Sequence, residues 1–187
     1  MKRSDEAIKE SRLALRLDPL SPTINSQLAW TLLAAGKYGS AVEQWKRTLE
    51  LDPNLLEAHL WLSKAYWTRG LYPEAISEAE KAASYSGRTP RYVAGVGHAL
   101  AAAGKRAEAH NIIDELAQTS KSVNVSPSYF AGIYSMLGER DQAFEWLEKA
   151  YQVRDYQLTP IMIDPVFGSI RSDPRYTDLL RRMGLRQ

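Results

Sequence analysis

Hydrophobic residues along this chain recur at steps of three and four, the spacing that places them on one face of an α-helix. Residues 22–35 follow this rule through Leu28 and Leu32, and a second amphipathic run covers residues 38–51. Gly36 stands between the two runs. Glycine favours a helix end because, without a Cβ, it adopts a positive φ at little cost. The pattern predicts an antiparallel helical hairpin.

The hairpin pattern repeats every 34 residues. One column of the repeat is always alanine and another is glycine: Ala7, Ala41, Ala75, Ala109 and Ala143, with Gly36, Gly70, Gly104 and Gly138. Small residues suit places where two helices cross closely, because a larger side chain costs roughly 1–3 kcal/mol when forced into such a contact. The period predicts complete hairpins at about 22–55, 56–89, 90–123 and 124–154, preceded by a lone second helix at 4–18.

Helix starts carry their own signals. Ser21-Pro22, Thr89-Pro90 and Ser126-Pro127 place a hydroxyl before a proline, which predicts a capping side chain followed by a first-turn proline. Asp164-Pro165 and Asp173-Pro174 have the same form in the C-terminal segment, residues 155–187, where the 34-residue spacing is no longer recognisable. We therefore expect a short helical cap at 155–187.

The repeat resembles the tetratricopeptide repeat (TPR) family over residues 1–154. The resemblance rests on the motifs AIKESRLALRLDP (7–19) and AVEQWKRTLELDP (41–53) and on the alanine and glycine columns. The fourth position of each repeat departs from the family pattern, with Asn25, His59, Val93 and Pro127. The resemblance implies an all-α fold, a right-handed superhelical α-solenoid of antiparallel hairpins. It also implies that the first helices line a concave groove for a protein or peptide.

The C-terminal segment adds a second resemblance. The pattern DP…F…IRSDPRY…LLRRMGL is similar to the closing segment of bacterial TPR regulatory proteins, in which the array often follows a winged-helix or kinase domain. This resemblance implies that the chain is the sensing or docking part of a larger regulatory protein. Two interpretations of the lone first helix stay open: the chain is a piece of a longer protein, or it forms a homodimer through residues 1–19.

The composition limits the classes of partner that the chain is expected to bind. The net charge is +2 and the chain has no cysteine, so neither a strong field toward nucleic acid nor a thiolate site is indicated. The sequence has neither a signal peptide nor the roughly 20 consecutive apolar residues of a membrane helix, so we expect a cytoplasmic protein with no membrane contact. An RNA-binding helical repeat is disfavoured because the expected groove carries few cations.

The expected groove is aromatic. Counting along the repeat places eight candidate ligand-binding residues on it: Gln27, Trp30, Trp61, Lys64, Trp67, Arg91, His98 and Tyr129. Aromatic residues dominate binding hot spots, so we expect a peptide or protein segment of apolar or aromatic character. The alternative is that the tryptophans fill space between repeats.

Catalysis is not predicted. The three histidines His59, His98 and His110 occupy different helices, with no helical metal-ligand pair and no phosphate-binding loop. We expect a protein that is not an enzyme and that uses no cofactor and no metal.

Overall fold

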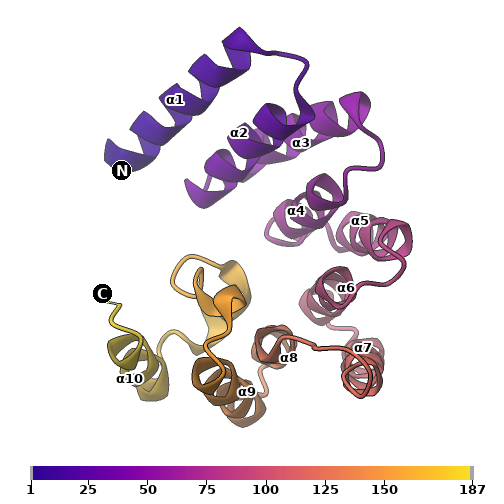
Figure 1. The fold of residues 1–187 in the computed structure, drawn as a ribbon, viewed down its shortest axis with the longest axis vertical. Helices are drawn as coiled ribbons and strands as arrows, with labels where there is room; N and C mark the ends of the chain where they lie inside the picture. Colours follow the sequence, from indigo (N-terminus) through magenta and orange to yellow (C-terminus); the bar gives the residue numbers. More distant parts are fainter. Residues whose placement is uncertain (1, 186–187) are drawn as a thin grey trace. The chain divides into compact units, whose positions relative to one another are not determined.

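The computed structural model describes the backbone of residues 2–185 and the side chains from Ser4 onward, and these residues form an all-helical fold (Figure 1). The α-helices are α1 (Lys2–Leu17), α2 (Pro22–Ala34), α3 (Tyr38–Leu51), α4 (Leu56–Trp67), α5 (Tyr72–Tyr85), α6 (Pro90–Ala102), α7 (Arg106–Thr119), α8 (Pro127–Leu137), α9 (Arg140–Gln152) and α10 (Pro174–Arg182). Two short 3-10 helices, η1 (Tyr156–Leu158) and η2 (Pro165–Ile170), lie between α9 and α10. Between residues 2 and 185, no helix is both long and apolar enough to cross a membrane.

Consecutive helices pair as hairpins, α2 with α3, α4 with α5 and α8 with α9 among them. The predicted glycine column occupies the turn inside each hairpin. Gly36, Gly70, Gly104 and Gly138 all have positive φ, between 72° and 77°. A side chain at this φ is strained, so the repeated glycine is explained by backbone conformation.

Helix capping follows the prediction at three places and departs from it at one. The side chains of Ser21, Asp164 and Asp173 accept N–H bonds at the starts of α2, η2 and α10. Ser126 does not cap α8; its hydroxyl instead donates to the Asp155 carboxylate, which also accepts the backbone N–H of Ser128 at 3.2 Å. The prediction for Ser126 is wrong because an ionised carboxylate from another segment is the stronger acceptor.

The chain divides into two compact units, residues 1–95 (unit 1) and residues 96–187 (unit 2), and each is described by itself. Unit 1 holds α1 to α5 and the start of α6. Unit 2 holds the rest of α6 and everything that follows it. The expected boundary at residue 154 between array and cap stays a prediction.

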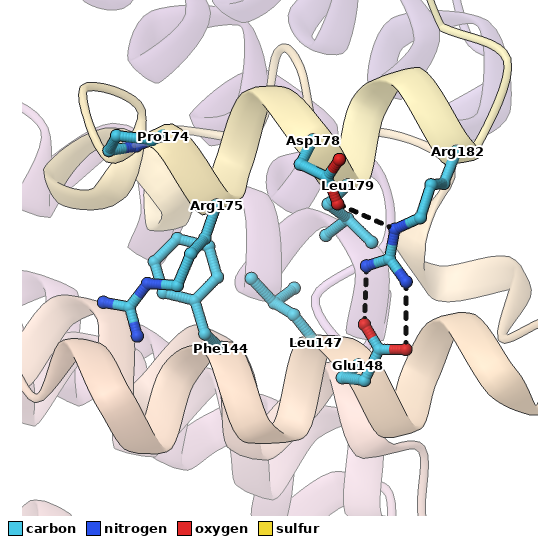
Figure 2. A pocket seen from close by; sticks show the side chains of 8 residues that line it. All are labelled: Phe144, Leu147, Glu148, Pro174, Arg175, Asp178, Leu179 and Arg182. Atoms are coloured by element: carbon cyan, nitrogen blue, oxygen red, sulfur yellow. Dashed lines mark hydrogen bonds and ion pairs between the residues drawn. The ribbon is translucent and has the colours of Figure 1, made fainter.

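The C-terminal segment of unit 2 keeps the repeat register. Arg182 of α10 forms two hydrogen bonds with Glu148 of α9, at 3.1 and 2.6 Å (Figure 2). Arg175 donates to Asp141 at 2.8 Å. The partners in both pairs are 34 residues apart. The hydroxyl of Ser169, just inside η2, bonds to that of Ser135 of α8 across the same interval, at 3.1 Å. Although the spacing cannot be recognised in the sequence, η2 and α10 stand where a fifth hairpin would place its helices.

Candidate functional site

A groove of about 450 Å³ opens in unit 1 on the side of the first helices α2 and α4. Its lining comes from α2, from α4 and from the residue before α4: Thr23, Ser26, Gln27, Trp30, Leu55, Glu57 and Trp61. Three of the eight predicted ligand-binding residues, Gln27, Trp30 and Trp61, are therefore together in one cavity. Gln27 is exposed, and both tryptophans are partly buried.

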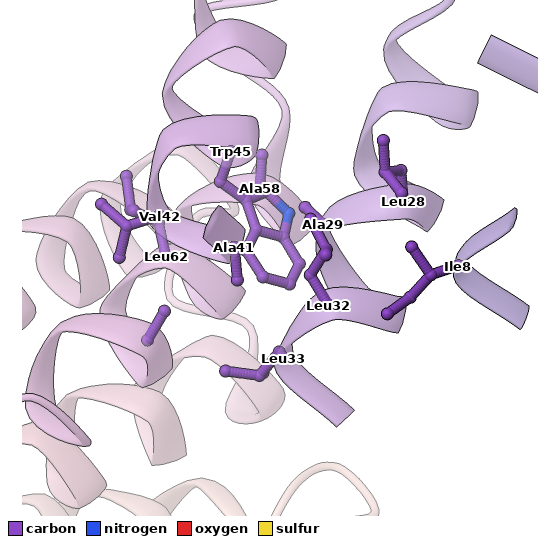
Figure 3. Close-up of a cluster of buried hydrophobic side chains, with 11 residues drawn as sticks. Ile8, Leu28, Ala29, Leu32, Leu33, Ala41, Val42, Trp45, Ala58 and Leu62 are labelled. Atoms are coloured by element: carbon purple, nitrogen blue, oxygen red, sulfur yellow. The ribbon is translucent and has the colours of Figure 1, made fainter. Parts of the chain in front are cut away.

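Trp61 is held rigidly at the edge of the unit 1 core. Its ring stacks on the fully buried Trp45 of α3, with 6.4 Å between ring centroids and 17° between planes. The ammonium of Lys64 lies 4.5 Å from the centroid of the Trp61 ring. Trp45 in turn belongs to the core cluster with Ala29 and Leu62 (Figure 3). The indole face that Trp61 presents to the groove thus rests on packed side chains and loses little entropy on binding.

Trp30 joins the same arrangement from the neighbouring helix. It packs against the core cluster and stays partly exposed where it lines the groove. Ser26, one turn before it, accepts a 3.3 Å hydrogen bond from the Trp45 indole N–H. Both tryptophans of the groove therefore cover the core with one part of the ring and line the cavity with another.

Glu57 is the charged residue among those lining the groove, and its carboxylate is neutralised within unit 1. It accepts from the Arg91 guanidinium at 2.9 Å, the Tyr92 hydroxyl at 3.0 Å and the Trp61 indole N–H at 3.1 Å. Burial, reinforced by the nearby negative charge of Glu57, raises the pKa of the Tyr92 hydroxyl. The groove is consequently aromatic and polar, with little net charge.

The other predicted residues have different surroundings. Lys64 is buried beneath Trp61, Arg91 supports Glu57, and Trp67 is partly buried at the C-terminal end of α4. His98 belongs to unit 2, where its Nε2 would lie 2.5 Å from a Cβ added at Gly132. Tyr129 is partly buried on α8. A ligand-binding role stays a prediction for all eight residues, the three that line the groove included.

A pair of buried polar networks was not predicted from the sequence. In the first hairpin, the Asn25 amide donates to the carbonyls of Pro19 (3.0 Å) and Ser21 (2.8 Å), and its oxygen accepts from Gln44 at 2.6 Å. Asn25 occupies the fourth repeat position, which departs from the family pattern. Its hydrogen bonds explain how a polar residue is tolerated there.

The second hairpin has an equivalent network, in which a histidine and a glutamate replace the asparagine and glutamine of the first. His59 lies with Nε2 2.9 Å from the Pro53 carbonyl and Nδ1 2.5 Å from the Glu78 carboxylate. Burial alone would raise the pKa of Glu78, but hydrogen bonds from His59 and Lys81 outweigh it and hold the pKa below its usual value. The imidazole thus lies between two oxygen acceptors and joins α4 both to Glu78 of α5 and to the segment before α4. The repeat spacing could have revealed this second network. Pro53, His59 and Glu78 lie 34 residues after Pro19, Asn25 and Gln44, which form the first network.

A second cavity, of about 430 Å³, lies between α9 and α10 in unit 2 (Figure 2). Its floor is apolar, formed by Phe144, Leu147 and Leu179. The Arg175 guanidinium lies 4.2 Å from the Phe144 ring centroid, and the Glu148–Arg182 pair spans the space between the helices. Two arginines of α10 thus pack on aromatic rings of α9, Arg175 on Phe144 and Arg182 on Tyr151. Among the described residues, no cluster of three or more His, Cys, Asp or Glu is arranged to hold a metal ion.

Comparisons with known proteins agree with this architecture. Residues 26–89 match the family model described as Tetratricopeptide repeat. No curated protein is significantly similar in sequence. The matched residues contain most of α2, all of α3 to α5 and the whole lining of the groove except Thr23.

Several solved structures share the fold. A thermophilic TPR protein of Thermus thermophilus is 23% identical, with a TM-score of 0.69, and the alignment covers 96% of this chain and 92% of that one. YrrB, described as a TPR protein with an unusual peptide-binding site, is 15% identical over 94% of this chain and 91% of its own, with a TM-score of 0.54. MamA is 20% identical over 84% and 86% of the two chains, with a TM-score of 0.57. At such identities these likenesses establish the fold.

The 34-residue register, the glycine turns, the paired helices and the family match at residues 26–89 point to one conclusion. Residues 26–89 match the tetratricopeptide repeat family, and the chain has the all-α fold of TPR proteins.

Proposed function

We propose that the chain is a non-enzymatic docking module whose unit 1 groove binds a protein or peptide segment of apolar or aromatic character. The observation that carries the proposal is the pair Trp30 and Trp61, which line one cavity from neighbouring helices while resting on a packed core. Rigid aromatic side chains in a concave site are the typical anchors of binding energy.

The low net charge of the groove favours a ligand of apolar or aromatic character. Glu57 already has Arg91, Tyr92 and Trp61 as donors, so a charged ligand group would compete with existing bonds. Thr23 and Gln27 are exposed along the same cavity and supply hydrogen-bonding groups for a peptide backbone. An extended segment that inserts an apolar side chain between the indoles fits this lining.

A library of random 12-residue peptides, displayed and selected on the intact chain, tests the proposal. Counter-selection uses Thr23→Arg, which places a long charged side chain in the groove from an exposed position. Tyr72→Ala is the matched control, because Tyr72 is an exposed aromatic residue of unit 1 that does not line the groove. We expect aromatic or aliphatic consensus sequences that bind wild type and Tyr72→Ala but not Thr23→Arg. Acidic consensus sequences, or binding indifferent to Thr23→Arg, would refute the proposal.

We also propose that this module is part of a larger protein. The similarity of residues 155–187 to the closing segments of bacterial regulatory proteins favours a sensing or docking role within a cytoplasmic regulatory protein. Expressing the gene with its flanking sequence in frame and determining the mass of the native polypeptide tests this directly. A native product with an N-terminal output domain is the expected result, and a native product limited to these 187 residues would contradict it.

A further inference from the structure

One of the tryptophans around the unit 1 groove has an unused hydrogen-bond donor. The Trp45 indole N–H donates to Ser26 at 3.3 Å, and the Trp61 indole N–H donates to Glu57 at 3.1 Å. The Trp30 indole N–H, by contrast, makes no hydrogen bond with any residue that the structure describes, and its nitrogen keeps access to solvent. Because the Trp30 ring lines the cavity, this donor is open to a bound ligand.

The groove side of α2 adds three more side chains that can donate. Ser26 uses its oxygen to accept from Trp45, so its own O–H is left to donate. Thr23 carries a hydroxyl and Gln27 carries an amide, and both side chains are exposed in the lining. The steps of three and four residues from Thr23 to Trp30 place all four residues on one face of the helix. This face therefore offers a ligand a row of hydrogen-bond donors.

The acceptors of the lining are already engaged to a greater degree than the donors. Glu57 is the charged acceptor of the groove, and its carboxylate receives hydrogen bonds from Arg91, Tyr92 and Trp61. The side chain of Leu55 offers no acceptor. An ordinary extended peptide carries one N–H for each C=O, so it would bring N–H groups against a lining whose main acceptor is in use. The groove consequently favours a backbone with carbonyl groups and few N–H groups.

Proline is the residue that supplies such a backbone. It has a carbonyl but no backbone N–H, and its ring fixes φ near about −65°. Consecutive prolines form a polyproline II helix without internal hydrogen bonds, so their carbonyls stay open to donors. The apolar rings dock on aromatic side chains, the mode by which aromatic-lined grooves bind proline-rich segments. An α-helix fits less well, because its backbone groups are paired with one another and leave the donors of α2 unused.

We infer that the unit 1 groove selects a proline-rich segment in the polyproline II conformation. The inference rests on the proposed function and names the class of segment that the groove binds. A proline ring packs on the indoles of Trp30 and Trp61, and a neighbouring backbone carbonyl accepts the Trp30 N–H. Trp61 is fixed by its stack on Trp45, and a polyproline II segment is preformed, so binding orders little on either side.

Isothermal titration calorimetry of the intact chain with two blocked peptides of equal length tests the inference. One peptide is polyproline, and the other is built from Gly, Leu and Ser, so that it keeps apolar side chains and a complete set of backbone N–H groups. Polyproline should bind at least roughly tenfold more tightly. Trp30→Phe keeps an aromatic ring but removes the N–H, so it should weaken polyproline binding by roughly tenfold. Tyr72→Phe, which removes a donor from an exposed ring outside the groove, should leave binding unchanged.

The outcomes separate this inference from the function on which it rests. Equal affinity for the two peptides overturns the inference, and so does polyproline binding that is indifferent to Trp30→Phe. Polyproline binding that survives Thr23→Arg lies outside the groove and overturns it too. If the Gly, Leu and Ser peptide binds in a manner sensitive to Thr23→Arg and polyproline does not bind, the inference fails and the proposed function stands. Absence of binding by both peptides and by every selected library peptide overturns both.

Discussion

Replacing His59 should measure how much its hydrogen bonds to Glu78 and to the Pro53 carbonyl stabilise the second hairpin. His59 is 4% exposed and joins α4 both to Glu78 of α5 and to the carbonyl of Pro53. His59→Leu takes the imidazole away from two partly buried acceptors, and an unsatisfied buried group costs about 1–3 kcal/mol, with more for a charged group. Lys81 still pairs with Glu78 at 2.7 Å, which reduces the loss. We expect a destabilisation of about 3 kcal/mol.

The double variant His59→Leu, Glu78→Leu measures the interaction between these two residues apart from their interactions with other neighbours. Replacing a buried ion pair by apolar residues of similar volume is often nearly neutral, so the double variant should be more stable than the sum of the single changes predicts. A coupling energy of about 1–3 kcal/mol is expected from urea unfolding followed by circular dichroism. Strictly additive single changes would refute the interpretation of His59 and Glu78 as a mutually satisfied pair, and so would a His59→Leu chain as stable as wild type.

Three further predictions rest on single features. Trp45→Ala should destabilise unit 1 by about 3–5 kcal/mol in urea unfolding, because it empties a fully buried site; a loss below about 1 kcal/mol would contradict the packing. Gly138→Ala should cost about 1–2 kcal/mol at its φ of 76°, whereas Gly39→Ala, which meets nothing within 4 Å and has no positive φ, should be neutral or stabilising in the same assay. Hydrogen bonds from Arg175 lower the pKa of Asp173 from 3.8 to about 2, so the stability it contributes is complete above the unfolded value and is lost as pH falls toward about 2. Asp173→Asn should therefore flatten the fall of the thermal midpoint between about pH 4 and pH 2, and an unchanged slope would contradict the assignment.

The sequence carried enough information to predict the repeated hairpin because its period is imposed by backbone geometry. The turn at Gly36 needs a positive φ and the crossing at Ala41 needs a small side chain, so the same residue types recur every 34 positions. Hairpin turns and the groove position of Trp30 and Trp61 follow from this register. The fold prediction of an all-α TPR solenoid is confirmed by the helices and by the similar solved structures.

The features that were not predicted depend on partners distant in sequence. The role of His59 needs Pro53 and Glu78 at once, and hydropathy alone does not report such a combination. Ser126 was expected to cap α8, but its hydroxyl donates to the carboxylate of Asp155, 29 residues later in the chain. The continued register of the C-terminal segment is likewise visible only as contacts, since its column residues have changed identity while Asp141 and Arg175 keep the spacing.

The most direct test of the central claim is the affinity of a selected apolar peptide for the wild-type chain and for Trp30→Ala, measured by isothermal titration calorimetry after circular dichroism has verified the fold. A hot-spot tryptophan contributes at least about 2 kcal/mol, so the account predicts that Trp30→Ala weakens binding by roughly thirtyfold while Tyr72→Ala leaves it unchanged. Equal affinity of wild type and Trp30→Ala would contradict the claim that the unit 1 groove is the binding site.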